Sequence, residues 1–300
     1  MTLNRRRFLS FVSAACLTAA AGPAAAFRWQ GVALGAKAQI VLDHPDAEAI
    51  TRAARAEITR LEQVFSLYGP DSEIMRLNRT GSLDAPSFEL LECLSLARRV
   101  HDLSGGLFDP TVQPLWQVMA EAAAQNRAPG AEALAQARAR VGFDRVDVAA
   151  ERITLGKGQA LTLNGIAQGF IGDKVADLMA ERGVADVLID TGEIIALGDA
   201  PTGTGWPITL AGSGRKDRWR NRALASSATF GTVMDADRGQ GHILAPDGTA
   251  VAATQTTVSA PSAGLADALS TALCLAKDET KARRLLSLVK EASLERFIQG

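Results

Sequence analysis

A carboxylate and a hydroxyl stand four residues apart near the C-terminus, in the run Ala-Asp-Ala-Leu-Ser-Thr at 266–271. On a helix, residues four apart share a face, so the side chains of Asp267 and Thr271 would point to one place. Their oxygens are hard ligands, which suit Mg²⁺ better than zinc. An acid in the first turn of a helix also interacts favourably with the helix dipole without binding any ligand. The spacing is therefore compatible with a magnesium site but does not establish one.

A glycine-containing turn separates a strand-like run from a helix-like run at 161–170, Leu-Thr-Leu-Asn-Gly-Ile-Ala-Gln-Gly-Phe. Exposed backbone groups at such a junction can bind phosphate or give a carbonyl oxygen to a cation. The run lacks the glycine spacing of a dinucleotide-binding loop and the Gly-Lys-Ser/Thr of a P-loop. A tight turn with a purely structural role explains it equally well.

Three further segments carry side chains suited to binding. Residues 104–110 combine two glycines, which let the backbone approach a ligand closely, with a phenylalanine and an aspartate. Tyr68, the only tyrosine, directly follows a long helical pattern, and His242 precedes a Pro/Gly turn. The other histidines, His44 and His101, are far apart in the sequence, so no zinc site is expected. No G-x-S-x-G or Cys/His nucleophile pattern is present.

Hydrophobic periodicity predicts the elements that must position these side chains. Helices are predicted at 46–67, 88–103, 121–140, 167–181, 265–277 and 279–289, and strands at 36–42, 145–148, 160–163, 184–189, 254–260 and 292–298. Residues 201–250 are rich in Gly, Asp, Thr and Ser, which favours short strands and loops. Because helices and strands mix without a regular βαβ period, the expected fold class is α+β rather than a doubly wound sheet.

The N-terminus has the pattern of an export signal. Arginines fill positions 5–7, an apolar run covers 11–21, and three alanines at 24–26 suit a signal peptidase. The apolar run is shorter than the roughly 20 residues that span a bilayer as a helix. Paired arginines favour the twin-arginine route over an ordinary Sec signal or a lipoprotein signal at Cys16. We therefore expect cleavage near Ala26, with residues 1–26 removed and residues 27–300 working in the periplasm.

Composition narrows the function of the mature chain. Removing residues 1–26 leaves 274 of 300 residues and takes away three arginines and no acid, so the net charge falls from −1 to −4. Without a basic cluster, no nucleic-acid partner is expected. Cys93 and Cys274 each lie in an apolar helical pattern, which favours two buried thiols over one disulfide, although an oxidising compartment would permit the bond.

Six blocks in a fixed order resemble the ApbE family of FAD:protein FMN transferases across nearly all of the mature chain. They are Tyr-Gly-Pro-Asp-Ser-Glu-Ile-Met-Arg-Leu-Asn (68–78), Gly-Gly-Leu-Phe-Asp-Pro-Thr-Val (105–112), Asn-Gly-Ile-Ala-Gln-Gly-Phe (164–170), Asp-Thr-Gly-Glu (190–193), His-Ile-Leu-Ala-Pro (242–246) and Ala-Asp-Ala-Leu-Ser-Thr (266–271). The form Leu-Asn-Gly-Ile-Ala-Gln-Gly is most similar to the NosX branch, periplasmic proteins that serve nitrous oxide reductase maturation. The resemblance implies an ApbE-like mixed fold with a flavin pocket between a helix–strand core and loops.

The resemblance also implies a reaction, in which Mg²⁺-dependent transfer moves FMN from FAD to a threonine hydroxyl of a target protein and AMP leaves. The expected target is the periplasmic FMN-binding domain of a NosR-like membrane electron-transfer protein. By similarity, Mg²⁺ would be bound by the side chains of Asp267 and Thr271 and by backbone oxygens of Gly165 and Gly264. The FAD pocket would comprise Leu34, Tyr68, Leu107, Phe108, Asp109, Thr162, Gln168 and Ile243. Asp267, as acceptor of the threonine proton, and His242 are the candidate catalytic residues.

Some positions depart from the family pattern. The family's block usually opens with Asp and carries Gly-Gly-Ile-Ala-Lys-Gly, whereas this chain has Thr162, Asn164 and Gln168, and Thr191 stands in the usual Gly-Gly-Glu. This chain thus lacks the acid and the base that the family usually carries in this block, which the resemblance places near the nucleotide. Two alternatives to the transferase stay open: an FAD pyrophosphatase that releases FMN and AMP, and a non-catalytic FAD-binding assembly factor.

Overall fold

The computed structural model describes residues 18–19, 26–33, 36–210, 214–235 and 240–300. Most of the expected signal peptide, and Leu34 of the expected FAD pocket, lie outside the described residues. None of the helices in the described part of the chain has the length and apolar character needed to traverse a bilayer.

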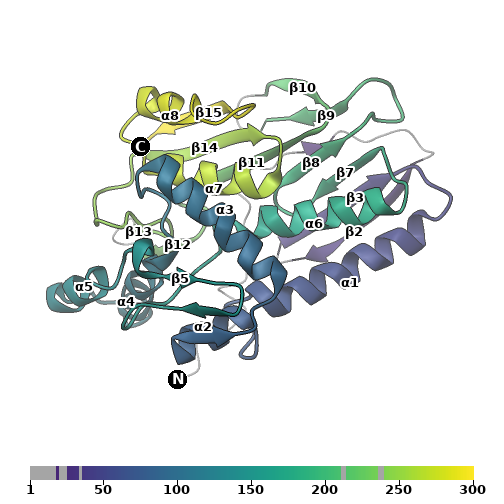
Figure 1. The fold of residues 1–300 in the computed structure, drawn as a ribbon. Helices are drawn as coiled ribbons and strands as arrows, with labels where there is room; N and C mark the ends of the chain where they lie inside the picture. Colours follow the sequence, from purple (N-terminus) through teal and green to yellow (C-terminus); the bar gives the residue numbers. More distant parts are fainter. Residues whose placement is uncertain (1–17, 20–25, 34–35, 211–213, 236–239) are drawn as a thin grey trace.

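A seven-stranded sheet forms the centre of the molecule, and every neighbouring pair in it is antiparallel (Figure 1). The strand order is β15-β14-β11-β8-β7-β3-β2. The strands are β2 Phe27–Ala33, β3 Ala36–Leu42, β7 Val187–Asp190, β8 Ile194–Leu197, β11 Arg222–Ala228, β14 Ala253–Ala260 and β15 Ser293–Gln299.

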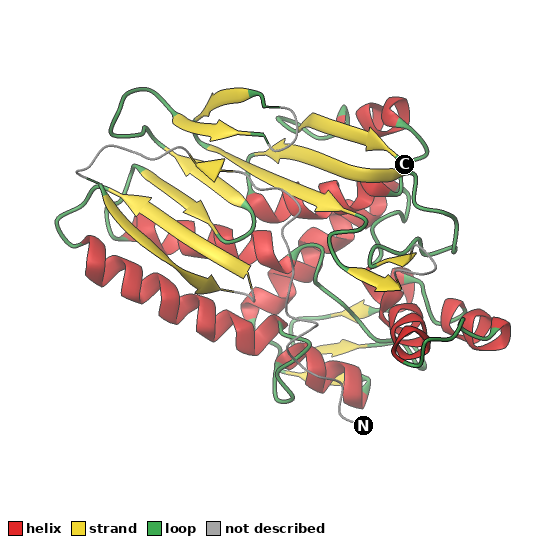
Figure 2. Cartoon of the chain, turned by 180° about the vertical axis from the view of Figure 1, so that it is seen from behind, coloured by secondary structure: helices red, strands yellow, loops and turns green. Residues whose placement is uncertain are grey.

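Helices cover one face of this sheet, as Figure 2 shows from behind. They are α1 Ala47–Phe65, α6 Ala167–Glu181 and α7 Ala263–Cys274, with α3 Phe88–Ser104 packed outside α7. The alternation of β3 explains the two layers, since Ile40 joins the core under the helices while Val41 joins a second core. That second core lies against β9 Trp206–Thr209 and β10 Lys216–Trp219. Strand β9 is the middle strand of a small antiparallel sheet, with β10 on one side and β1 Thr18–Ala19 on the other.

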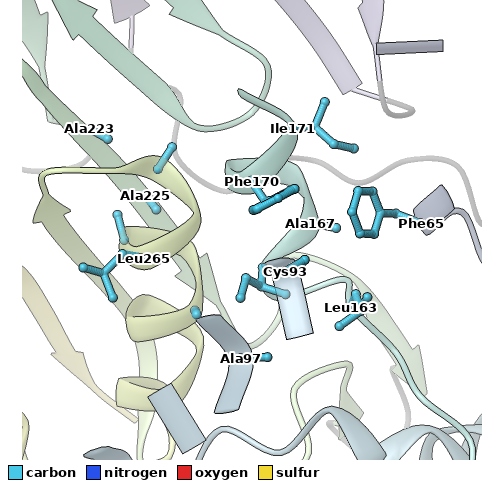
Figure 3. Close-up of a cluster of buried hydrophobic side chains, with 14 of the residues drawn as sticks. Phe65, Cys93, Ala97, Leu163, Ala167, Phe170, Ile171, Ala223, Ala225 and Leu265 are labelled. Carbon is cyan, nitrogen blue, oxygen red and sulfur yellow. The ribbon is translucent and has the colours of Figure 1, made fainter. Parts of the chain in front are cut away.

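The core between α6 and α7 is densely filled. In Figure 3, Phe170 of α6 and Leu265 of α7 lie over Ala223 and Ala225 of β11. The rings of Phe65 and Phe170 meet edge to face, with centroids 5.6 Å apart. Alanine side chains on β11 and α7 let helices α6 and α7 pack close to the sheet.

The remaining elements lie at one end of the sheet, apart from the last helix, which packs against β15. They are α2 Glu73–Thr80, β4 Ser82–Asp84, η1 Pro110–Val112, α4 Gln113–Ala124, α5 Ala131–Arg138, η2 Phe143–Arg145, β5 Asp147–Val148, β6 Arg152–Thr154, β12 Val233–Asp235, β13 Gln240–Gly241 and α8 Glu279–Leu286. Strands β4, β6 and β5 form a small sheet, and β12 pairs with β13.

Most sequence predictions of secondary structure are confirmed, and the α+β class with them. Two predictions are wrong. The single helix expected at 121–140 is two helices, because Asn126 at φ 50°, Pro129 and Gly130 interrupt it. Residues 160–163 form no strand, because the side-chain amide of Asn78 bonds both the N–H and the C=O of Leu161, at 2.7 and 2.8 Å.

The favoured interpretation of the cysteines is also confirmed. Cys93 and Cys274 are both free and buried. Burial raises the pKa of the Cys274 thiol to about 11, so it stays protonated and unreactive at neutral pH.

Candidate active site

Helices α6 and α7 start side by side, and this crossing sets the positions of Asp173 and Asp267. A Cβ atom on Gly169 would lie only 2.2 Å from the carbonyl oxygen of Ala263, so only glycine permits the approach. Asp173 of α6 accepts the backbone N–H groups of Ala263 and Gly264 at 2.7 and 2.8 Å. A carboxylate at these free N–H groups also suits the helix dipole of α7. The register of α7, and hence the place of Asp267, follows from these contacts.

A cavity of about 260 Å³ opens at this end of the sheet. Its lining collects residues from every block that the sequence singled out. They are Tyr68, Leu107, Phe108, Asp109, Thr162, Asn164, Gly165, Gln168, Glu193, His242, Ile243, Asp267 and Thr271, together with Leu67, Pro110, Val112, Gln113, Trp116, Ser226, Ser227, Ala228, Gly231, Thr232, Leu244 and Leu275. Segments that are up to two hundred residues apart in the chain thus share one site.

Asp267 is buried in the wall of the cavity, with 5% of its surface exposed. Its Oδ2 accepts the N–H of Gly169 at 3.2 Å. Burial raises the pKa of the Asp267 carboxyl to about 7, and the nearby Asp173 adds to the shift, while the hydrogen bond from Gly169 opposes it. At neutral pH the Asp267 carboxyl is therefore only partly ionised, and a cation bound beside it would favour the ionised form.

Thr271 lies one turn after Asp267 on the same face of α7, as the spacing predicts. Its Oγ1 is 3.1 Å from Oγ of Ser227, which in turn is 2.7 Å from Oγ of Ser270. A Cβ on Gly165 would approach Thr271 Oγ1 to 2.9 Å, so the backbone of the 161–170 turn passes directly beside this hydroxyl. Asp267, Thr271 and Gly165 thus line one part of the cavity.

Gly264 is not among the residues that line the cavity. It sits at the start of α7, where a Cβ would contact the backbone of Phe170 at 3.2 Å. Within the described ranges, no group of three or more His, Cys, Asp and Glu side chains is arranged to hold a metal ion. The set expected by similarity contains a single carboxylate, so its metal role stays a prediction.

Glu193 is a second buried carboxylate in the cavity, and the sequence analysis gave it no role. Its Oε2 accepts the N–H of Ser226 at 3.2 Å, and 7% of the residue is exposed. Burial, and then the proximity of Asp267, raise the pKa of Glu193 well above its usual range. The only sequence signal for Glu193 was its place in the block at 190–193. Its nearness to Asp267 depends on the pairing of β8 with β11, which local pattern does not reveal.

Gln168 occupies the position where the family usually has lysine. Its Nε2 donates a short hydrogen bond to the carbonyl oxygen of Thr191. Gly192 follows at φ 108°, and a Cβ there would collide with the Gln168 amide. Gln168 therefore ties the start of α6 to the turn after β7, and its amide is committed to the protein backbone.

Asp109 and Phe108 also line the cavity. The Asp109 carboxylate accepts the N–H of Thr111 at 2.8 Å and the N–H of Phe143 at 3.2 Å, so both of its oxygens have protein partners. His101 supports this segment, because its Nδ1 lies 2.9 Å from the carbonyl oxygen of Phe108. Asp109 thus shapes the turn that presents Leu107 and Phe108 to the cavity.

His242 and Tyr68 also line the cavity. Nδ1 of His242 is 3.2 Å from the carbonyl oxygen of Thr232, and burial lowers the pKa of the imidazole, so the ring is neutral at pH 7. Tyr68 is 54% exposed, which leaves a face of its ring open to a ligand at the cavity mouth. Thr162 is bonded locally, its Oγ1 accepting the N–H of Asn164 at 3.3 Å.

Among the described residues, the charged side chains that line the cavity are all acidic. Three acids line it, and none of the described lining residues is lysine or arginine. A ligand with a phosphate anion would meet buried carboxylates rather than a basic side chain. Such a ligand requires a cation bound with it, or protonated carboxyls, because unpaired like charges in a buried site are costly.

The raised pKa values predict how stability depends on pH. Burial raises the pKa of Asp267 to about 7 and that of Asp173 to about 6, from an ordinary value of 3.8 for each. A carboxyl with a raised pKa holds its proton more tightly in the folded than in the unfolded protein. The free energy of unfolding of metal-free protein should therefore fall as pH rises from about 4 to about 7, then level off.

Thermal unfolding in the presence of a chelator checks this expectation. The melting temperature should drop between about pH 5 and pH 7, and the drop should be smaller in the Asp267→Asn variant. A melting temperature that rises over the same interval would contradict the assignment of these two groups.

A sequence model of the ApbE family matches residues 34–295. The chain is 26% identical over 208 residues to the FAD:protein FMN transferase of Chlamydia muridarum, a match that covers 66% of each protein. It is 29% identical over 219 residues to that of Vibrio cholerae, covering 69% of this chain and 65% of the relative. The chain thus spans slightly less than two thirds of the length of these curated relatives.

The match to solved structures covers a larger share of both chains than the match to the curated relatives. The apo form of the Pseudomonas stutzeri flavinyl transferase ApbE gives a TM-score of 0.79 at 24% identity, covering 92% of this chain and 94% of that one. The ApbE protein of Thermotoga maritima gives 0.81 at 22% identity, covering 91% and 94%. At these identities the likeness establishes the fold.

Proposed function

The chain belongs to the ApbE family, and from this premise we propose that it transfers FMN from FAD to a threonine hydroxyl of an acceptor protein, with release of AMP. The observation that carries the proposal is the single cavity in which Tyr68, Phe108, Ile243, Asp267 and Thr271 meet. Aromatic and aliphatic side chains at its mouth suit a flavin or adenine ring, and oxygen ligands at its inner end suit a pyrophosphate with its cation. The curated relatives are named FAD:protein FMN transferase, which supports the transfer of FMN from FAD to a protein.

The residues present fit a magnesium ion. Asp267 and Thr271 supply a carboxylate and a hydroxyl, and the backbone of Gly165 passes beside that hydroxyl. All three would offer hard oxygen ligands, and the absence of lysine and arginine among the described lining residues leaves a phosphate anion without another partner. When bound, Mg²⁺ would neutralise charge that develops on the pyrophosphate oxygens.

The chain's own side chains then position the reactants. The acceptor hydroxyl oxygen forms a bond to the FMN phosphorus, the bond from that phosphorus to the AMP oxygen breaks, and the hydroxyl proton passes to a base. His242 lines the cavity as a neutral imidazole and is able to accept a proton. Asp267 is the alternative acceptor, because it lies beside Thr271 at the inner end. Ser227 holds the Thr271 hydroxyl in place through its 3.1 Å contact.

For the acceptor we propose the FMN-binding domain of a NosR-like membrane electron-transfer protein in the periplasm, which would place the chain in nitrous oxide reductase maturation. Two sequence features support this. The twin-arginine pattern at positions 5–7 favours export of residues 27–300, and the Leu-Asn-Gly-Ile-Ala-Gln-Gly run is most similar to the NosX branch.

Incubation of the mature protein with FAD, Mg²⁺ and the acceptor domain tests the proposal. We expect a fluorescent acceptor whose mass increases by one FMN residue, together with an equal amount of AMP. Changing the acceptor threonine to valine should abolish the adduct. Release of FMN and AMP without any acceptor would instead indicate the FAD pyrophosphatase, and tight FAD binding without AMP would indicate a non-catalytic assembly factor.

Tyr68 should contribute to FAD affinity through its exposed ring. Tyr68→Ala is expected to weaken FAD binding about tenfold, whereas Tyr68→Phe, which keeps the ring, should stay within about twofold of the wild type. Quenching of flavin fluorescence on titration measures both. Phe88→Ala is a suitable control, because Phe88 is 74% exposed but does not line the cavity. Equal affinity for all four proteins would show that Tyr68 does not contact the ligand.

A further inference from the structure

A second and larger cavity, of about 640 Å³, lies beside the candidate active site. Helices α4 and α5 form one side of it, and described residues from 229–234, 240–245 and 248–254 form the other. These elements group together at one corner of the molecule in Figure 1. The two cavities share Ile243 and Leu244 as a common wall. We call the second cavity the acceptor groove.

The lining of the acceptor groove is mostly apolar. Leu115 and Met119 come from α4, Leu134 from α5, and Phe230 and Met234 from the opposite side. Phe230 is 47% exposed, so its ring is accessible to a molecule that occupies the groove. None of these five residues lines the candidate active site.

The only charged side chains among the described lining residues are two arginines. Arg138 packs directly against Gly248. Arg127 donates only to neighbours on its own loop, with Nε 2.7 Å from Oε1 of Gln125 and Nη1 3.5 Å from the carbonyl oxygen of Ala128. The groove therefore favours an occupant with a negative charge, although the mature chain as a whole is mildly acidic.

One wall of the groove offers free backbone donors. Residues 249–252 belong to no helix or strand and lead directly into β14. Within the described part of the chain, the backbone N–H groups of Ala250 and Val251 have no hydrogen-bond partner, while Ala252 on the inner side donates to Cys274. Unpaired donors beside a strand are a site at which an extended peptide can pair.

We propose that the acceptor groove binds an extended, acidic segment of the acceptor protein and directs its hydroxyl over the Ile243–Leu244 wall into the active site. This inference rests on the proposed function. Apolar side chains of the segment would contact Phe230 and Met119, its carboxylate would face Arg127, and its backbone would pair with Ala250 and Val251. The groove thus selects the protein substrate, while the neighbouring cavity binds FAD.

Steady-state transfer to the NosR-like FMN-binding domain tests the proposal with two variants and two matched controls. Phe230→Ala and Arg127→Glu alter exposed groove residues, so neither should disturb folding. Phe88→Ala and Arg182→Glu make the same changes at exposed positions outside both cavities. We expect each groove variant to raise KM for the acceptor domain about tenfold, with KM for FAD and kcat within about twofold of wild type.

The possible outcomes separate this inference from the proposed function. No adduct from the wild-type protein would overturn both. Transfer by the wild type, with groove variants that match their controls, would overturn the groove alone. A rise in KM for FAD in the groove variants would also overturn it, since the groove would then hold part of the nucleotide rather than the acceptor.

Discussion

Asp267→Asn should lower the rate of FMN transfer about a thousandfold while leaving FAD binding largely intact. The change removes a negative charge from the inner end of the cavity, where neither lysine nor arginine lies among the described lining residues. The asparagine carbonyl can still accept the N–H of Gly169, so the crossing of α6 and α7 is preserved. The loss should therefore appear in kcat and in magnesium affinity rather than in stability.

Two substitutions at Thr271 provide a matched comparison for this experiment. Thr271→Ser keeps a hydroxyl and should retain most of the activity, whereas Thr271→Val keeps the shape and removes the oxygen. The order of activity should be wild type, then Thr271→Ser, then Thr271→Val, with Asp267→Asn lowest. Titration with Mg²⁺ at fixed FAD gives the affinities. Unchanged AMP release in Asp267→Asn would show that this carboxylate binds neither the metal nor the proton.

Most of the predicted site residues line one cavity, and local sequence signals explain the placement of several of them. Asp267 and Thr271 share a helix, and their common face follows from the period of α7 alone. The same applies to the turn before α6, because its glycines and the apolar pattern after it are local signals. The expected strand at 160–163 failed because a distant side chain, Asn78, satisfies the backbone there and takes the place of a neighbouring strand.

Long-range packing accounts for what the sequence did not reveal. Glu193 lies 74 residues from Asp267 in the sequence. The fold nevertheless brings the two carboxyls close enough for Asp267 to raise the pKa of Glu193. Ser227 lies in a stretch with no distinctive pattern, and the packing of α7 on β11 brings it to Thr271. The contact of Gln168 is also long-range, since its Nε2 donates to the carbonyl oxygen of Thr191 in the turn after β7.

Gly169→Ala is the substitution expected to damage the fold most. The added Cβ would lie 2.2 Å from the carbonyl oxygen and 2.4 Å from the carbonyl carbon of Ala263, so it meets backbone that cannot rotate away. Asp173 holds that backbone through two hydrogen bonds, and α7 is packed against β11 and β14. Helices α6 and α7 would have to separate, which also lengthens the contact from Gly169 N–H to Asp267.

Two opposing effects decide the size of the change. Alanine is the better helix former by about 1 kcal/mol. The clash should outweigh this gain and leave a net loss of about 3 kcal/mol in the free energy of unfolding. For a chain of this size that corresponds to a fall of about 6–12 °C in melting temperature. Gly130→Ala is the control, because a Cβ at Gly130 meets nothing within 4 Å. If Gly169→Ala melted at or above the wild-type temperature, the close crossing of α6 and α7, and with it the placement of Asp267, would be wrong.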